Sequence, residues 1–165
     1  TGGGGAILSR SPEFAAAAKH LTTTCRVPDT IEVAHDDVGY NYRMPNINAA
    51  LGCAQLEQLE RMVRAKRALA GVYRAFFAEA RISMQTELAG AESNFWLNAL
   101  LLGSREDRDA YLRYCRAHDV EARPCWTPMY RLPMYADCLR DDLRVTGDLA
   151  DRVVNIPSSV PQKDR

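Results

Sequence analysis

A long amphipathic pattern between Pro45 and Phe77 limits the fold of this 165-residue chain more than any other feature. Apolar residues recur along it every three or four positions, at Ile47, Ala50, Leu51 and Ala54 and then, after a five-residue step, at Leu59, Met62, Val63, Leu69, Val72, Tyr73, Phe76 and Phe77. This spacing predicts a helix that begins at Pro45-Asn46 and is bent or broken near Gln58.

Shorter predicted elements lie on both sides of this helix. Ala6–Ser9 predicts a short buried strand, and Ser11-Pro12-Glu13 predicts the capped start of a helix over Pro12–Leu21. Residues 25–45 show no period and predict a long loop, which in a compact domain is usually functional or mobile. The later part predicts, in order, a strand at Phe95–Leu102, a helix from Ser104 to about His118, a strand at Val120–Trp126, a ring-rich loop, a short helix from Gly147 and an extended piece at Asn155–Pro157. We therefore expect an α+β fold in which helices cover one face of a small sheet.

Composition excludes several classes of protein. Lys plus Arg and Asp plus Glu both total 21, and this zero net charge argues against a nucleic-acid binder. No apolar run approaches the ~20 residues of a membrane helix. The five cysteines form no C-x-x-C pair and the three histidines form no ligand cluster in the sequence, so we expect no metal site, reduced thiols and a cytoplasmic location.

The chain opens on Thr1 followed by four glycines, with no sign of a signal peptide. The glycines precede the first predicted strand and no Gly-Lys-Ser/Thr follows them, so they match neither a P-loop nor a dinucleotide fingerprint. We interpret this start as a cut within a longer protein, with a cloning scar as the alternative.

The most informative stretch is Asp37–Gly52, in which Tyr40, Asn41, Tyr42 and Arg43 stand just before a helix N-terminus. Side-chain donors, one fixed cation and the positive end of a helix dipole together form a good anion-binding arrangement. The alternative is an ordinary helix start, in which Asn41 satisfies the turn backbone and Arg43 pairs with a carboxylate. The residue types alone favour neither interpretation.

The segment Gly-Tyr-Asn-Tyr-Arg-Met-Pro-Asn-Ile-Asn-Ala-Ala-Leu-Gly at 39–52, followed by Ala-Gln-Leu-Glu-Gln-Leu at 54–59, resembles the signature of pyridoxal-phosphate-dependent sugar-nucleotide aminotransferases of the DegT type. The opening Thr-Gly-Gly-Gly-Gly-Ala-Ile-Leu is similar to the segment that follows the Schiff-base lysine in that family. Three later segments are similar to the branch that acts on nucleotide-linked 4-keto-6-deoxy amino sugars, namely Arg123-Pro124-x-Trp126, Arg131–Tyr135 and Asn155–Ser159. The resemblance covers nearly the whole chain, and the segment at 39–52 is its specific part.

This resemblance implies part of a fold-type I aminotransferase that works as a homodimer. Residues 1–45 would end the large cofactor-binding α/β domain, and residues 46–165 would form the small C-terminal domain, with a small antiparallel sheet covered by helices. It also implies pyridoxal 5'-phosphate as cofactor, a nucleotide-linked keto-deoxysugar as substrate, glutamate as amino donor, and a role in making sugars for surface polysaccharides or glycans.

The resemblance assigns roles to four neighbouring residues. Asn41 matches the asparagine that reaches across the dimer to the cofactor phosphate of the partner. An amide suits that role because it donates a hydrogen bond without adding charge. Arg43, Tyr40 and Tyr42 stand beside it as candidate substrate-binding residues that contact sugar or nucleotide phosphates.

The resemblance also bears on two aromatic residues of the later part and on the lysines. Trp126 and Tyr130 fall on the substrate-side loop of the family, and many relatives carry His where Tyr130 stands, which leaves the sugar preference open. The lysines are Lys19, Lys66 and Lys163, and none precedes the glycine run. The catalytic lysine of the family would then fall before the first residue, so we expect no catalytic residue here and no activity from this chain alone. A non-catalytic dimerisation or interaction module is the alternative.

Overall fold

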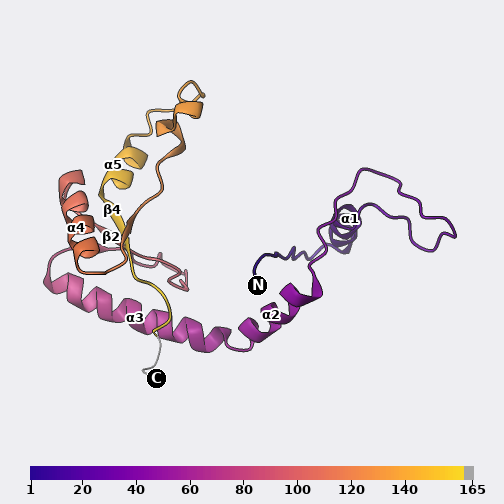
Figure 1. The fold of residues 1–165 in the computed structure, drawn as a ribbon, viewed down its shortest axis with the longest axis horizontal. Helices are drawn as coiled ribbons and strands as arrows, with labels where there is room; N and C mark the ends of the chain where they lie inside the picture. Colours follow the sequence, from indigo (N-terminus) through magenta and orange to yellow (C-terminus); the bar gives the residue numbers. More distant parts are fainter. Residues whose placement is uncertain (162–165) are drawn as a thin grey trace. The chain divides into compact units, whose positions relative to one another are not determined.

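The computed structural model describes residues 1–161, and the chain forms two compact units, Thr1–Leu59 and Glu60–Arg165. The first unit contains helices α1 and α2, and the second contains the sheet with helices α4 and α5 and nearly all of α3 (Figure 1). In the part of the chain that the structure describes, no helix has the length and apolar character needed to cross a membrane.

Helix α1 spans Pro12–Thr22 and confirms the predicted helix start. The side chain of Ser11, the N-cap residue, accepts a hydrogen bond from the backbone N–H of Phe14 at 3.1 Å. Proline fits the first helical turn because its missing N–H would have no partner there. Glu13 adds a negative charge in the first turn, where the helix dipole favours it.

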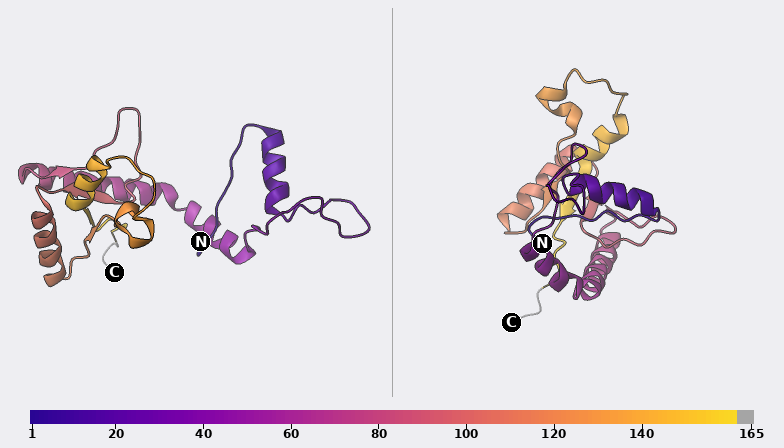
Figure 2. Two further views of the ribbon diagram at one scale, coloured as in Figure 1. Left: turned by 90° about the horizontal axis from the view of Figure 1, so that it is seen from above. Right: turned by 90° about the vertical axis from the view of Figure 1, so that its right-hand side faces the viewer.

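The segment at residues 25–45 forms a long loop, as predicted, that leaves the end of α1 and returns beside it (Figure 2). The return is fixed by backbone hydrogen bonds: Tyr40 N–H donates to the Leu21 carbonyl at 2.7 Å, and Tyr42 N–H donates to the Thr22 carbonyl at 2.9 Å. Thr24 N–H in turn donates to the Tyr40 carbonyl at 3.1 Å. The residues singled out by the sequence are therefore held against the C-terminal end of α1.

The strand predicted at Ala6–Ser9 is wrong for the described chain. These residues are exposed, with Leu8 at 93%, and none of the strands formed by residues 1–161 pairs with them. A run of apolar residues forms a strand only where another strand edge accepts its backbone hydrogen bonds.

The predicted break in the long amphipathic helix is confirmed. Helix α2 spans Asn46–Leu56 and helix α3 spans Leu59–Glu79, with Glu57 and Gln58 between them. The break falls at the five-residue step in the apolar pattern, because a continuous helix would rotate its apolar stripe off one face there.

The second unit contains a four-stranded antiparallel sheet, which confirms the α+β prediction. The strands are β1 (Ser83–Met84), β2 (Asn98–Leu101), β3 (Arg123–Pro124) and β4 (Val153–Ile156), in the order β1-β2-β4-β3. Leu100 of β2 lies opposite Val154 of β4, and both side chains are fully buried. They form the core with Phe77 of α3, Leu102 and Ile156, and residues of α4 pack against it.

Other boundaries differ from the prediction. Strands β2 and β3 are shorter than predicted, β1 was not predicted, and two 3-10 turns occupy the ring-rich loop at Met129–Arg131 and Pro133–Tyr135. Helix α4 spans Arg105–Ala117 after the predicted N-cap Ser104, and α5 spans Arg144–Arg152. Gly147 therefore lies inside α5 rather than at its start. It is buried, and a Cβ there would lie 2.9 Å from the Tyr130 hydroxyl.

Candidate functional site

The first unit contains a pocket of about 780 Å³ beside the N-terminus of α2. It is lined by the glycine run, the end of α1 and the segment that leads into α2, through Gly3, Gly4, Gly5, Ala6, Ile7, Lys19, Thr22, Tyr42, Arg43, Met44, Pro45 and Asn48. Two features that the sequence singled out separately, the glycines and the segment before α2, thus meet in one pocket.

Asn48, in the first turn of α2, holds the glycine run in place. Its side-chain amide donates to the carbonyl of Thr1 at 2.6 Å and to the carbonyl of Gly3 at 3.2 Å. A Cβ at position 4 would lie 2.6 Å from the methyl group of Met44, which is the flexible end of that side chain. The φ of +148° at Gly4 lies in the region that favours glycine, so a residue with a side chain would be strained at this point of the pocket wall.

The pocket is suited to an anion. Among the described residues that line it, Lys19 and Arg43 are cationic and none is acidic. The N-cap of α2 is Pro45, which provides no side-chain cap for the first N–H groups of the helix. Uncapped N–H groups and the helix dipole favour a negative charge at this point, and the two cations strengthen that preference.

The structure agrees with one half of the ordinary helix-start interpretation of the segment before α2 and differs from the other half. Oδ1 of Asn41 accepts the N–H of Arg43 at 3.3 Å, so this amide does satisfy the turn backbone. The Arg43 guanidinium donates to the carbonyl of Thr23 at 3.1 Å, and in residues 1–161 no carboxylate is within ion-pair distance of it. Its positive charge is therefore not neutralised by an acidic partner.

The four candidate binding residues at positions 40–43 do not all line the pocket. Tyr42 and Arg43 line the pocket, whereas Tyr40 and Asn41 are not among its lining residues. The Tyr40 ring stacks on the Tyr42 ring, with centroids 5.7 Å apart. Because Oδ1 of Asn41 is engaged with the backbone, its exposed NH2 group is the part that can donate to a ligand.

Trp126 and Tyr130 belong to the second unit, and they border different hollows. Trp126 is 76% exposed and lines both a hollow of about 270 Å³ with Arg131 and a hollow of about 650 Å³ with Trp96. Tyr130 lines a third hollow, of about 410 Å³. Its hydroxyl accepts a hydrogen bond from Nε of Arg131 at 3.0 Å.

A bidentate ion pair between Arg131 and Asp151 holds the loop that carries Tyr130. The guanidinium of Arg131 meets Asp151 of α5 through hydrogen bonds of 2.5 Å and 3.0 Å. The hydrogen bonds from Arg131, and to a smaller extent the positive charge of Arg131, hold the pKa of Asp151 below the ordinary value of an aspartate. A carboxyl group whose pKa is lowered on folding contributes stability above its unfolded pKa, and that contribution is lost as the pH falls through the folded value.

We expect the substitution Asp151→Asn to lower the free energy of unfolding of the second unit by about 1–2 kcal/mol at neutral pH. The loss should shrink below about pH 4, where the unfolded carboxyl group begins to bind its proton. The matched control is Asp148→Asn, which breaks the more exposed i,i+4 pair with Arg152 and should cost at most about 0.5 kcal/mol. Urea unfolding at several pH values measures both, and a loss for Asp151→Asn that does not change with pH would contradict the assignment.

Lys66, a partly buried residue of α3, has a structural role. Its ammonium group donates to the carbonyl of Trp96 at 3.3 Å and to the carbonyl of Ser158. Burial lowers the pKa of Lys66 from its ordinary value. These contacts join α3 to one end of the antiparallel β2–β4 pair, where β2 begins and β4 ends. Lys163 lies outside the described residues.

Sequence reasoning missed two residues of the pocket, Lys19 and Asn48, and one cluster nearby. Lys19 carried no signal beyond its charge, and Asn48 stands inside the segment at 39–52, where the resemblance assigned no role to it. His20, Cys25 and Asp36 come together at the base of the loop, although no metal site was expected.

Comparison with known proteins places the chain in a family. Residues 1–164 match the DegT/DnrJ/EryC1/StrS aminotransferase family. The GDP-perosamine synthase of Vibrio cholerae is 34% identical over 127 residues, which are 75% of this chain and 35% of that protein. The putative pyridoxal phosphate-dependent aminotransferase EpsN of Bacillus subtilis is 30% identical over 163 residues, 96% of this chain and 42% of EpsN.

Solved structures share the fold. Helicobacter pylori PseC, an aminotransferase involved in the biosynthesis of pseudoaminic acid, aligns with a TM-score of 0.83 at 18% identity over 94% of this chain and 43% of PseC. The aminotransferase TlmJ of Streptoalloteichus hindustanus aligns with a TM-score of 0.82 at 20% identity, over 94% of this chain and 42% of TlmJ.

The chain belongs to the DegT/DnrJ/EryC1/StrS aminotransferase family, whose cofactor is pyridoxal 5'-phosphate. Its small antiparallel sheet covered by helices is that of fold-type I sugar aminotransferases, as the resemblance implied. The chain spans between about a third and two fifths of the length of the curated relatives it matches.

Proposed function

We propose that this chain is the C-terminal part of a pyridoxal-phosphate-dependent aminotransferase that moves an amino group from glutamate to the keto carbon of a nucleotide-linked keto-deoxysugar. The enzyme would act in the cytoplasm, as a homodimer, in making sugars for surface polysaccharides or glycans. The observation that carries the proposal is the cationic pocket beside the N-terminus of α2, which lies within the segment that resembles the family signature.

The residues of the pocket fit a phosphate group. Arg43 and Lys19 supply positive charge, and the first N–H groups of α2 supply donors with the favourable end of the helix dipole. Asn41 does not line the pocket, but it stands two residues before Arg43 and offers an exposed amide donor, held in orientation by its hydrogen bond with the Arg43 N–H. When bound, pyridoxal phosphate supplies the electron sink that amino transfer requires.

We further propose that residues 1–45 end the large domain and residues 46–165 form the small domain. Neither Lys19 nor Lys66 is proposed as the catalytic lysine. Lys19 lines the pocket as a phosphate partner, and Lys66 is bonded to two backbone carbonyls. The catalytic lysine would be contributed by a segment that precedes residue 1, and the chain by itself would be inactive.

The test is the affinity of the intact protein for pyridoxal phosphate after the substitution Asn41→Ala, followed by cofactor fluorescence. A hydrogen bond to a charged group contributes about 1.5–3 kcal/mol, so the affinity should fall about 10- to 100-fold. Asn94→Ala is the matched control, because Oδ1 of Asn94 also accepts the N–H two residues ahead, that of Trp96 at 3.0 Å. This control should bind the cofactor as the unaltered protein does.

The alternative class, a non-catalytic dimerisation or interaction module, predicts a different result. It predicts that the chain self-associates. It also predicts that neither the Asn41→Ala variant nor the Asn94→Ala variant shows a binding signal with pyridoxal phosphate or with a nucleotide sugar. Exposed apolar side chains on α2, such as Ile47 at 76% and Leu56 at 68%, are compatible with such a surface. Equal cofactor affinity of the Asn41→Ala variant and the unaltered protein would favour this module and contradict the aminotransferase proposal.

A further inference from the structure

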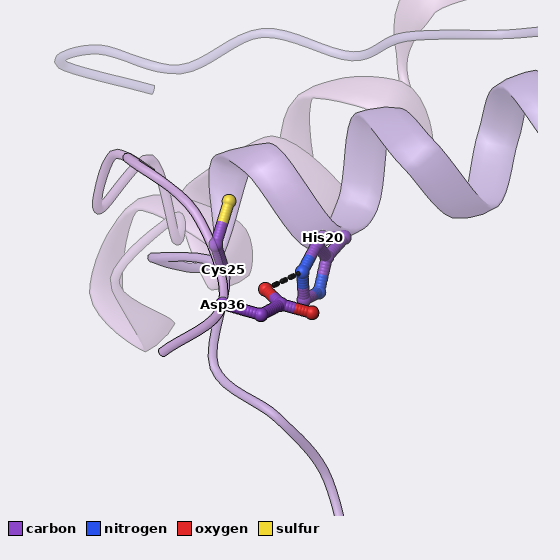
Figure 3. Close-up of side chains that lie close together, drawn as sticks. All are labelled: His20, Cys25 and Asp36. Atoms are coloured by element: carbon purple, nitrogen blue, oxygen red, sulfur yellow. Dashed lines mark hydrogen bonds and ion pairs between the residues drawn. The ribbon is translucent and has the colours of Figure 1, made fainter. Parts of the chain in front are cut away.

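Three side chains of the kinds that bind metals meet at the base of the long loop (Figure 3). His20 lies in the last turn of α1, Cys25 follows it by five residues, and Asp36 lies on the returning arm of the loop. Nε2 or Nδ1 of the histidine, Sγ of the cysteine and a carboxylate oxygen of the aspartate all lie within 4.8 Å of one another. A nitrogen, a sulfur and an oxygen ligand are thus available in one place.

The backbone holds these three residues together. Cys25 N–H donates to the His20 carbonyl at 2.9 Å, and Asp36 N–H donates to the Cys25 carbonyl at 3.2 Å. The cluster is therefore linked by main-chain hydrogen bonds and does not depend on three mobile surface side chains. Preorganisation of this kind reduces the conformational entropy that binding would otherwise cost.

The charge and the accessibility of the cluster also favour a cation. Cys25 is only 2% exposed, whereas Asp36 remains accessible, so the site has one buried ligand and an open side. Nε2 of His20 lies 2.6 Å from Oδ1 of Asp36, so the carboxylate already orients the imidazole. Asp36 and Asp37 place negative charge near the Cys25 thiol, and this charge would attract a divalent ion.

We propose that His20, Cys25 and Asp36 form a binding site for Zn²⁺ or a similar divalent ion of borderline softness. Zinc accepts sulfur, nitrogen and oxygen ligands, and three protein ligands leave a fourth position for water. A tetrahedral zinc site places neighbouring ligand atoms ~3.3–3.5 Å apart, so the side chains need to move by on the order of 1 Å.

Binding exchanges a defined set of bonds. The S–H bond of Cys25 breaks and its proton goes to solvent, while the sulfur forms a bond to the metal. The hydrogen bond between His20 and Asp36 is replaced by one metal bond to each side chain. The backbone N–H groups of Tyr40 and Tyr42 donate hydrogen bonds to carbonyls at the end of α1. An ion that holds the end of α1 to the loop would therefore stabilise the segment that carries Asn41. This second site rests on the cluster alone and does not require the proposed aminotransferase activity.

The experiment uses the intact protein without an affinity tag, freed of metal by a chelator and kept reduced, and titrated with Co²⁺. We expect one equivalent of Co²⁺ to produce a thiolate-to-cobalt absorption band that Zn²⁺ then abolishes. The substitutions Cys25→Ser and Asp36→Asn should each weaken binding at least tenfold. Cys53→Ser, at an exposed cysteine of α2, is the matched control and should leave the titration unchanged.

Two outcomes would overturn the proposal. One is the absence of a thiolate-to-cobalt band in the unaltered protein. The other is a band that persists in Cys25→Ser and Asp36→Asn, or that disappears in Cys53→Ser. Because Asp36 is exposed, its amide variant retains the packing around Cys25 and keeps the test valid if Cys25→Ser folds poorly.

Discussion

The substitution Gly39→Ala is expected to release the segment that carries Asn41 from the end of α1. A Cβ at position 39 would lie 2.4 Å from the Cys25 nitrogen, 2.4 Å from the carbonyl carbon of Thr24 and 2.8 Å from Sγ of Cys25. Two of these atoms belong to the backbone, so no side-chain rotation relieves the clash. Only glycine, which has no Cβ, fits at position 39 without displacing the backbone of Thr24 and Cys25. Overpacking of this kind costs about 1–3 kcal/mol, and occasionally more.

The measurement is amide hydrogen exchange at Tyr40 and Tyr42, whose N–H groups are bonded to the end of α1. A cost of 1.4 kcal/mol corresponds to a factor of about ten in an equilibrium constant, so exchange through local opening should be accelerated about tenfold or more. Both tryptophans, Trp96 and Trp126, lie in the second unit, so urea unfolding followed by their fluorescence should not change.

The matched control is Gly71→Ala in α3. A Cβ at Gly71 would meet nothing within 4 Å, and alanine is preferred to glycine inside a helix. This variant should stabilise the second unit by about 0.5–1 kcal/mol. Normal protection of the Tyr40 and Tyr42 amides in Gly39→Ala would contradict the close approach seen in the structure.

Local signals in the sequence predicted the helices well. The cap at Ser11, the cap at Ser104 and the break at Gln58 each depend on residues within one or two turns of a helix, and all three are confirmed. The strands were predicted less well, because a two-residue strand such as Ser83–Met84 exists only through its pairing with a partner far along the chain. The same dependence on a partner strand explains why the strand predicted at Ala6–Ser9 is absent from the described chain.

The pocket was predicted only in part, for a related reason. Arg43 and Tyr42 were found because they stand beside a helix start in the sequence. Lys19 was missed because it reaches the pocket through the packing of α1, which no local spacing reveals. The cluster of His20, Cys25 and Asp36 was missed for the same reason, since it forms only when the loop returns to the end of α1.

The substitution Leu100→Ala is expected to have the largest effect on the stability of the second unit. Leu100 is fully buried, and it packs in the core with Phe77, Val154 and Ile156. Truncation removes buried apolar surface and leaves a cavity between α3 and the sheet. Losses of this type lower the free energy of unfolding by about 2–5 kcal/mol.

The matched control is Leu139→Ala, because Leu139 is 103% exposed and its truncation leaves no cavity. Its effect should stay within about 0.5 kcal/mol. Urea unfolding followed by tryptophan fluorescence reports on the second unit for both variants, since both tryptophans lie there. A cost below about 1 kcal/mol for Leu100→Ala would mean that the site collapses on truncation, because a cavity that stays open costs more. The pairing of β2 with β4 over Phe77 would then not be the main source of stability in this unit.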